Sequence, residues 1–217
     1  MQGAQLSDLS CAILAGGKSS RMGAYKATLK YKGEPLILHV IRGLYDFFDD
    51  IVVSVGDHVQ RRALAELLHN YEKVKVLVDP VVRVRSPLIG LYTCLMGSHN
   101  DYVFATACDM PNVSSKVVTC LREELEGQGY SAIVPMWPNG FVEPLCAIYH
   151  RRETLSKIVD ALSYSEYSLR GLLKRLRVVK YLPISYLTSK GVSAKVFYNI
   201  NRPVSYTHLT LPTTERV

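Results

Sequence analysis

The chain has 217 residues, of which 48% are hydrophobic and 21% are charged. These values are typical of a soluble globular protein and exclude a disordered or collagen-like chain. No run of residues approaches the roughly 18 consecutive apolar residues of a membrane helix, and the first ten residues lack the basic segment of a secretory signal. The sequence therefore predicts a cytoplasmic protein with one α/β domain or two small lobes.

The net charge of +7 suits polyanionic partners such as nucleic acid, anionic lipid or phosphorylated small molecules. No RRM, zinc-finger or KH motif accompanies this charge, so we expect no nucleic acid partner and no membrane partner. The five cysteines are widely spaced and form no CxxC pair, which argues against a zinc ribbon or a redox dithiol. We expect reduced, buried thiols.

Apolar periodicity and turn residues predict alternating strands and helices. In chain order, we expect a strand at 9–14, a helix at 36–48, a strand at 50–55, a helix at 59–68, a strand at 74–78, a helix at 87–96, a strand at 102–107, a helix at 114–125, strands at 130–134 and 145–149, helices at 151–162 and 169–176, and strands at 178–182 and 195–198. The basic segment 169–180 could lie on a membrane or a partner, but we prefer a solvated helix that packs its leucines inward.

Strands and helices alternate through about two-thirds of the chain, which is typical of a mostly parallel sheet with helices on both faces. In such three-layer α/β folds, ligands bind at the carboxyl ends of the strands. We therefore expect the chemistry in the loops that follow Leu14, Val55, Val78 and Ala107.

The most informative segment is 14–26, LAGGKSSRMGAYK, in which a strand leads into glycines and hydroxyls. Glycines let backbone N–H groups approach an anion, and the Arg21 guanidinium with the Lys26 ammonium suits a triphosphate. The P-loop pattern fails because its first glycine falls on Ala12, and GxGxxG fails because Gly16 and Gly17 are adjacent. The alternative is a simple glycine turn with solvated basic residues.

This segment resembles the pattern LAGGxSxRMGxxK of the nucleotidyltransferases related to molybdenum cofactor guanylyltransferase, and it matches every fixed position. Further similar strings follow in family order: DP at 79–80, SPLIG at 86–90 for GPLxG, ACDMP at 107–111 for CDxP, EPLCAIY at 143–149 for EPLxAxY, and YNINRP at 198–203 for NxNxP. The resemblance spans about 190 residues and implies a three-layer Rossmann-like nucleotidyltransferase fold in a single domain, 1–203.

The last segment, 204–217, reads VSYTHLTLPTTERV and has no helical period. It resembles translated sequencing-adaptor or vector sequence, and the acidic stretch that usually follows the family's proline is absent. We expect a non-native or disordered tail, with the native C-terminus lost around Val204. Re-sequencing of the gene should return different codons there, and identical codons would contradict this interpretation.

The resemblance implies three catalytic residues, Arg21, Lys26 and Asp109. Asp109 follows a predicted strand, where a carboxylate can hold Mg²⁺ between phosphate groups. A turn or helix-cap role is the alternative for this aspartate. Arg21 and Lys26 would neutralise the triphosphate and the charge that builds on departing pyrophosphate.

The resemblance also implies two binding sets. The nucleotide-binding residues would be Leu14, Ala15, Gly16, Gly17, Lys26, Ser54, Asp79 and Asp109, and the acceptor-binding residues would be Ser86, Gly90, Asn199 and Asn201. Ser54 and Gly56 end a strand at which the family often offers an asparagine. Asn199 and Asn201 alternate on a predicted late strand and would share one face, although a turn-forming pair is an equal alternative. Arg83 and Arg85 could meet phosphate or lie in a solvated loop.

By resemblance, the chain transfers GMP from GTP to the terminal phosphate of molybdenum-molybdopterin and releases pyrophosphate, with Mg²⁺ as cofactor. The attacking phosphate oxygen is already ionised near neutral pH, so no general base is required. A cytidylyltransferase or another NTP transferase with a different phosphorylated acceptor is one alternative. A non-catalytic nucleotide-binding protein is another. We expect a monomer that makes transient contacts with molybdenum cofactor proteins.

Overall fold

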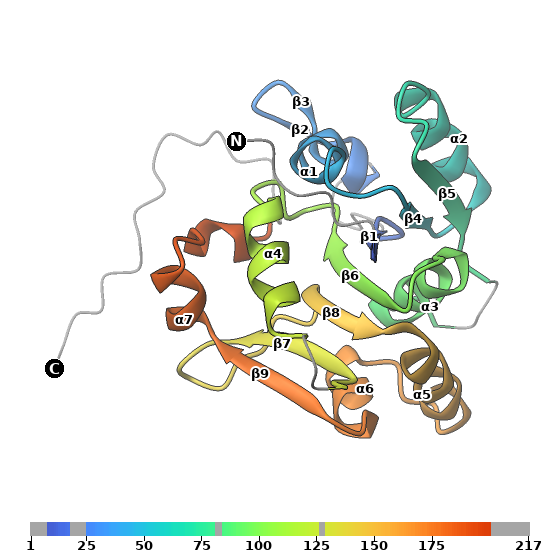
Figure 1. The fold of residues 1–217 in the computed structure, drawn as a ribbon. Coiled ribbons are helices and arrows are strands. Elements are labelled where there is room, and N and C mark those ends of the chain that lie inside the picture. The colour runs from blue at the N-terminus through green and yellow to red at the C-terminus, as the bar shows by residue number, and fades with distance from the viewer. Residues whose placement is uncertain (1–7, 18–24, 81–83, 126–128, 201–217) are drawn as a thin grey trace, which may run out of the picture.

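The computed structural model describes residues 8–17, 25–80, 84–125 and 129–200. Seven strands form one sheet in the order β5-β4-β1-β6-β8-β7-β9 (Figure 1). Their bounds are β1 Leu9–Leu14, β4 Ile51–Val55, β5 Val74–Val78, β6 Tyr102–Ala107, β7 Ala132–Met136, β8 Cys146–His150 and β9 Val179–Pro183. Only β8 among them runs antiparallel to its neighbours. The predicted mostly parallel sheet is confirmed.

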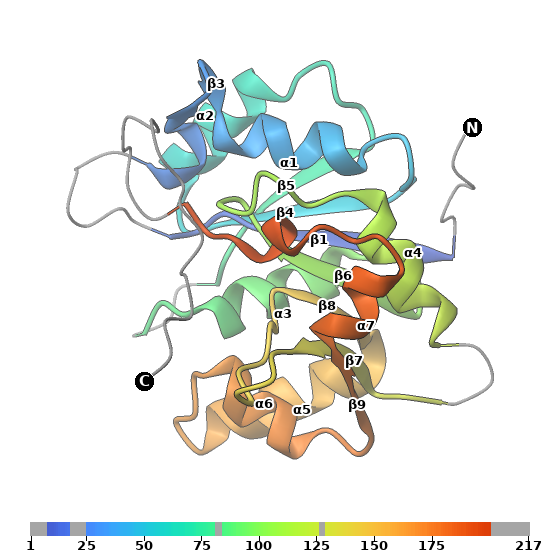
Figure 2. The same ribbon diagram turned by 90° about the vertical axis from the view of Figure 1, so that its left-hand side faces the viewer.

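Helices cover both faces of the sheet (Figure 2). One face carries α1, α2, α4 and α7, and the other carries α3, α5 and α6. Their bounds are α1 Leu36–Leu44, α2 His58–Leu67, α3 Pro87–Gly97, α4 Ser115–Glu123, α5 Arg151–Ser163, α6 Leu169–Arg175 and α7 Ile184–Ser189. No helix among the described residues is both long and apolar enough to cross a lipid bilayer.

The alternation of side chains along β1 divides the core into two layers. Cys11 and Ile13 pack on the first face, whereas Ala12 and Leu14 pack on the second. Every residue of β1 is buried, because it lies between β4 and β6 and is covered by helices on both sides. All five cysteines are free and buried, as predicted.

The sequence missed four elements and misassigned one. The predicted strand at 195–198 is wrong, because Ala194–Phe197 forms a 3₁₀ helix. Val196 and Phe197 are adjacent in sequence, yet both pack into the first core layer, which an alternating strand would not allow. The missed elements are α7, a 3₁₀ helix at Lys26–Thr28, and the hairpin of β2 (Lys30–Tyr31) and β3 (Glu34–Pro35). Positive φ angles at Lys32 and Gly33 are typical of a type I′ turn in this hairpin.

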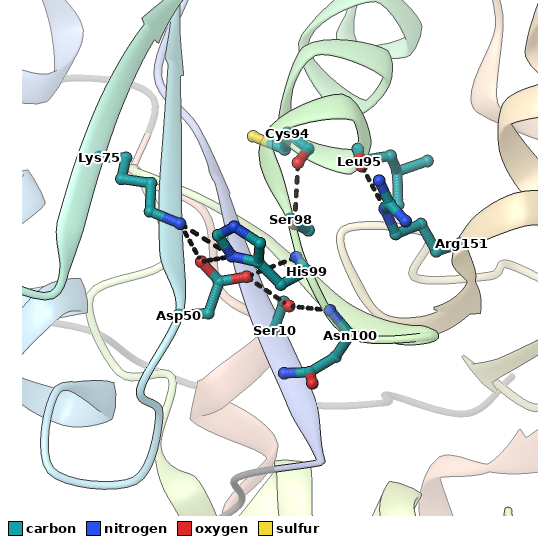
Figure 3. Close-up of polar contacts among 9 residues, drawn as sticks. All are labelled: Ser10, Asp50, Lys75, Cys94, Leu95, Ser98, His99, Asn100 and Arg151. Atoms are coloured by element: carbon teal, nitrogen blue, oxygen red, sulfur yellow. Dashed lines mark hydrogen bonds and ion pairs between the residues drawn. The ribbon is translucent and has the colours of Figure 1, made fainter.

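A polar network joins the amino ends of four strands, opposite the expected ligand edge (Figure 3). Asp50 is 6% exposed and accepts hydrogen bonds from Ser10 Oγ at 2.6 Å, Lys75 Nζ at 2.7 Å and the His99 amide at 2.8 Å. Asn100 donates its amide to Ser10 Oγ at 3.1 Å. Burial alone would raise the pKa of Asp50, but these donors outweigh it and lower the pKa below its usual range.

Replacement of Asp50 by asparagine should destabilise the fold by about 2–3 kcal/mol at pH 7, since hydrogen bonds to a buried charge are lost. Because the pKa of Asp50 is lower in the folded state, its carboxylate stabilises the fold fully at pH values above the pKa of the unfolded chain. This stabilisation is lost as the pH falls through the pKa of the folded state. The difference in the free energy of unfolding between Asp50→Asn and the unmodified chain should therefore shrink below about pH 4. Urea denaturation at pH 7 and pH 3.5 measures it.

Asp49→Asn is the matched control, because Asp49 is 47% exposed and its 3.3 Å ion pair with Lys73 is a surface pair. Such pairs contribute about 0–1 kcal/mol. Equal losses of stability for the two variants at pH 7 would contradict the assigned role of the Asp50 network.

Candidate active site

A cavity of about 450 Å³ opens at the carboxyl ends of β1, β4, β5 and β6. It lies where the sequence predicted the chemistry. The predicted site residues that line it are Leu14, Gly16, Gly17, Lys26, Ser54, Asp79, Ser86, Gly90, Asp109 and Asn199. Arg21, Asn201 and Arg83 lie outside the described residues.

Backbone hydrogen bonds beyond the strand ends hold the loops of the cavity in register. The amide of Ala15 donates to Ser54 O at 2.9 Å, and the amide of Cys108 donates to Leu14 O at 3.0 Å. The amide of Asp79 donates to Val55 O at 2.7 Å. Ala15 is buried and does not line the cavity, unlike the other predicted residues of the glycine turn, Leu14, Gly16 and Gly17. The three loops are therefore fixed by the sheet itself.

Lys26 and Asp109 form an ion pair at the β6 end of the cavity, through Lys26 Nζ and Asp109 Oδ2. Their side chains are 22% and 13% exposed, so the pair is largely shielded yet reachable from the cavity. The amide of Ile200 donates to Asp109 O at 2.9 Å and fixes the late segment against this loop. The pair provides a cation and a carboxylate beside the glycine turn, which suits a phosphate chain with a divalent metal.

A buried thiol, Cys108, lines the same end of the cavity. Burial, with a smaller effect of the neighbouring Asp109 charge, raises the pKa of Cys108 to about 12. The thiol is therefore neutral near pH 7, and a thiolate nucleophile is not the chemistry of this site.

The β4–β5 end of the cavity holds a second set of polar groups. Asp79 accepts a hydrogen bond from Thr93 Oγ1 at 2.6 Å, and burial raises its pKa although Thr93 and the Arg85 charge act in the opposite direction. Arg85 Nη1 lies 3.6 Å from Asp57 Oδ2. Gln60 Oε1 accepts the amide of Gly56 at 2.7 Å. Arg85 thus lies at the end of the cavity remote from the Lys26–Asp109 pair.

Two hydroxyls in the wall, Ser54 Oγ and Ser86 Oγ, are buried and have no hydrogen-bond partner in the described part of the chain. Buried polar atoms are nearly always paired, so these hydroxyls are suited to a polar ligand. Ser86 precedes α3 at the N-cap position, yet its side chain caps nothing. Its φ of −149° is extended backbone, so serine in place of the family's glycine causes no strain at this position.

Sequence reasoning did not single out Asp57, Gln60 and Thr93. Asp57 and Gln60 lie at the start of α2, where the Asp57 side chain caps the Gln60 amide. That capping pattern was visible in the sequence, but it gives no sign of a neighbouring cavity.

The inward leucines of the basic segment are confirmed, since Leu169, Leu172 and Leu173 of α6 are buried.

A parallel sheet that presents a glycine turn, a lysine–aspartate pair and unpaired hydroxyls to one cavity is the architecture of a nucleotidyltransferase. Comparison with known proteins agrees with this class. The MobA-like NTP transferase domain matches residues 11–179. The chain belongs to this family.

Relatives and a solved structure extend the agreement over most of the chain. A protein of Natranaerobius thermophilus named "Probable molybdenum cofactor guanylyltransferase" is 32% identical over 90% of this chain and 92% of its own length. One of the same name from Thermococcus sibiricus is 35% identical over 87% and 91%. The crystal structure of molybdopterin-guanine dinucleotide biosynthesis protein A from Archaeoglobus fulgidus superposes with a TM-score of 0.74 at 27% identity, covering 89% of this chain and 93% of that one.

Gly16 should be intolerant of a side chain. A Cβ there would lie 2.9 Å from Asp79 Oδ2 and 3.1 Å from the Gly56 amide nitrogen. We expect Gly16→Ala to cost about 1–3 kcal/mol of stability, as overpacking does. Gly17→Ala is the control, because a Cβ on Gly17 meets no described atom within 4 Å. Urea denaturation of both variants measures the difference, and equal stabilities would show that the loop packs differently.

Proposed function

We propose that this enzyme transfers GMP from GTP to the terminal phosphate of molybdenum-molybdopterin and releases pyrophosphate. The observation that carries the proposal is the Lys26–Asp109 pair beside the glycine turn of one cavity. The names of the relatives support the choice of donor and acceptor. The β4–β5 end of the cavity would take the base, which leaves the triphosphate at the β6 end.

In the proposed reaction, an oxygen of the acceptor's terminal phosphate attacks the α-phosphorus of GTP. The new P–O bond forms as the bond from the α-phosphorus to the β-phosphate oxygen breaks, and pyrophosphate leaves with the electron pair. The attacking oxygen carries no proton near neutral pH, so no base is needed. Alignment of the two phosphates and neutralisation of their charge would supply the rate enhancement.

The residues at the β6 end fit Mg²⁺. Mg²⁺ sites on nucleotides use one or two carboxylates together with phosphate oxygens, and Asp109 supplies one carboxylate. The described residues contain no cluster of three histidine, cysteine or acidic side chains that could hold a metal alone. When bound, Mg²⁺ would neutralise phosphate charge and template the in-line geometry. Lys26 would move from Asp109 to the phosphate chain, and Arg21 would add a second cation there.

Nucleotide specificity can be measured by thermal unfolding of the full chain with GTP, CTP, ATP or UTP, each with and without Mg²⁺. A ligand at 100 times its Kd stabilises by about 2.7 kcal/mol. We expect a Mg²⁺-dependent shift with GTP. A shift with CTP alone would instead favour a cytidylyltransferase, and no shift with any nucleotide would favour a non-catalytic protein.

Asp109→Asn should lower turnover at least about a hundredfold while the protein stays folded, since it removes the charge that holds Mg²⁺. Pyrophosphate release from GTP and the molybdenum-molybdopterin acceptor measures the rate. Asp46→Asn is the control, because Asp46 is exposed and lies after α1, outside the cavity. Full activity of Asp109→Asn would refute its metal role.

A further inference from the structure

A half-buried carboxylate, Glu143, lies in the turn before β8, two residues from Leu145 of the cavity wall, and has no part in the proposed phosphate chemistry. Its Oε1 accepts a hydrogen bond from Trp137 Nε1 at 2.6 Å. Among the described residues, no cation pairs with it, and burial raises its pKa although the Trp137 bond opposes this effect. Removing an ionised carboxylate from water with only one indole N–H as donor destabilises the fold, unless a ligand brings further donors.

The backbone around Glu143 is held firmly. Its amide donates to Pro135 O at 2.9 Å, and its carbonyl accepts the amide of Cys146 at 3.1 Å. The hydroxyl of Tyr149 donates to Pro144 O at 2.7 Å. The turn that leads into β8 therefore sets the direction of the carboxylate before any ligand binds.

The indole that binds this carboxylate packs against a second aromatic ring. The ring of Trp137 meets that of Phe197 edge to face, with centroids 5.8 Å apart. Leu145 lies two residues after Glu143, Asn199 lies two residues after Phe197, and both line the cavity. The cluster of Glu143, Trp137 and Phe197 is therefore connected to the cavity wall through the chain at Leu145 and Asn199. Phe197 is 4% exposed and supports the indole from the core, whereas Trp137 is partly exposed and offers its ring to a flat heterocycle.

The strand order places this cluster on the acceptor side. Asp79 and Gly56 follow β5 and β4, the glycine turn follows β1, and Asp109 follows β6. Because the sheet runs β5-β4-β1-β6-β8, the turn before β8 comes next along the same edge. If the base binds at the β4–β5 end and the phosphates bind between β1 and β6, the cluster before β8 lies where the group attached to the acceptor phosphate would bind.

We propose that Glu143 binds the 2-amino-4-oxopyrimidine ring of the pterin acceptor, accepting hydrogen bonds from its ring N–H and its exocyclic amine, while Trp137 orients the carboxylate. Each carboxylate oxygen has two acceptor positions, so Oε1 can serve both Trp137 and the ligand. Paired N–H donors on a carboxylate give the geometric selectivity of a bidentate contact. Guanine presents the same donor pair, but the cluster lies away from the proposed base end. The inference rests on the proposed function.

Trp137 is the chain's only tryptophan, so intrinsic fluorescence reports on this cluster directly. The full chain is titrated with 6-hydroxymethylpterin, with the matching lumazine, which has a carbonyl in place of the 2-amino group, and with GMP. Equal additions to N-acetyltryptophanamide correct for light absorbed by the ligands. We expect saturable quenching by the pterin and at least tenfold weaker binding of the lumazine. Absence of saturable quenching by the pterin, or tighter binding of GMP at this cluster, would overturn the proposal.

Glu143→Gln keeps the size of the side chain and an acceptor for Trp137, but turns an N–H group toward the ligand donors. We expect at least tenfold weaker pterin binding, with little change for lumazine and an unchanged thermal shift with GTP and Mg²⁺. Glu66→Gln is the control, because Glu66 is exposed on α2. Equal pterin binding by Glu143→Gln and the unmodified chain would reject the role of Glu143. Absence of a thermal shift with GTP and Mg²⁺ in the unmodified chain would instead reject the proposed function.

Discussion

The parallel pairing of β1 with β4 and β6 is the constraint on which the site depends. Leu14 stands opposite Ser54 on one side and Ala107 on the other, so the chain leaves three strands at one level. The bonds from Ala15 and Cys108 extend that register into the loops. A slip of one residue would turn the alternating core of β1 inside out, so the apolar packing of both faces also fixes the level of the cavity floor.

Polar residues at the two edges of the sheet differ in how fully they are hydrogen-bonded. At the amino ends, Asp50 is buried with three donors, which lower its pKa. At the opposite edge of the sheet, Asp79 and Glu143 are half-buried and each accepts a hydrogen bond from one side chain, so burial raises their pKa values. Carboxylates with few hydrogen-bond donors destabilise the fold, and in the described residues they lie at the edge of the sheet that carries the cavity. The contrast is typical of a ligand site built on a sheet that is saturated elsewhere.

The sequence predicted the sheet well because β1, β4, β5 and β6 are short, largely apolar runs between turn residues. It failed at 195–198, where β-branched and aromatic residues follow a serine whose hydroxyl accepts the Lys195 amide and starts a 3₁₀ turn. It found Lys26 and Asp109 through a dense local motif. It named Arg85 but missed Asp57, because the proximity of these two residues depends on how two loops meet, which no single segment encodes.

The late segment shows why a short motif can matter without forming a strand. Asn199 was expected on an alternating strand, yet it reaches the cavity from an extended segment after the 3₁₀ helix. Phe197 anchors that segment against Trp137, and Ile200 binds the Asp109 carbonyl. Asn199 is therefore held between an aromatic contact and a backbone bond to the loop of Asp109. One segment thus contacts Trp137 through Phe197 and the backbone of Asp109 through Ile200, and these two contacts fix the position of Asn199 between them.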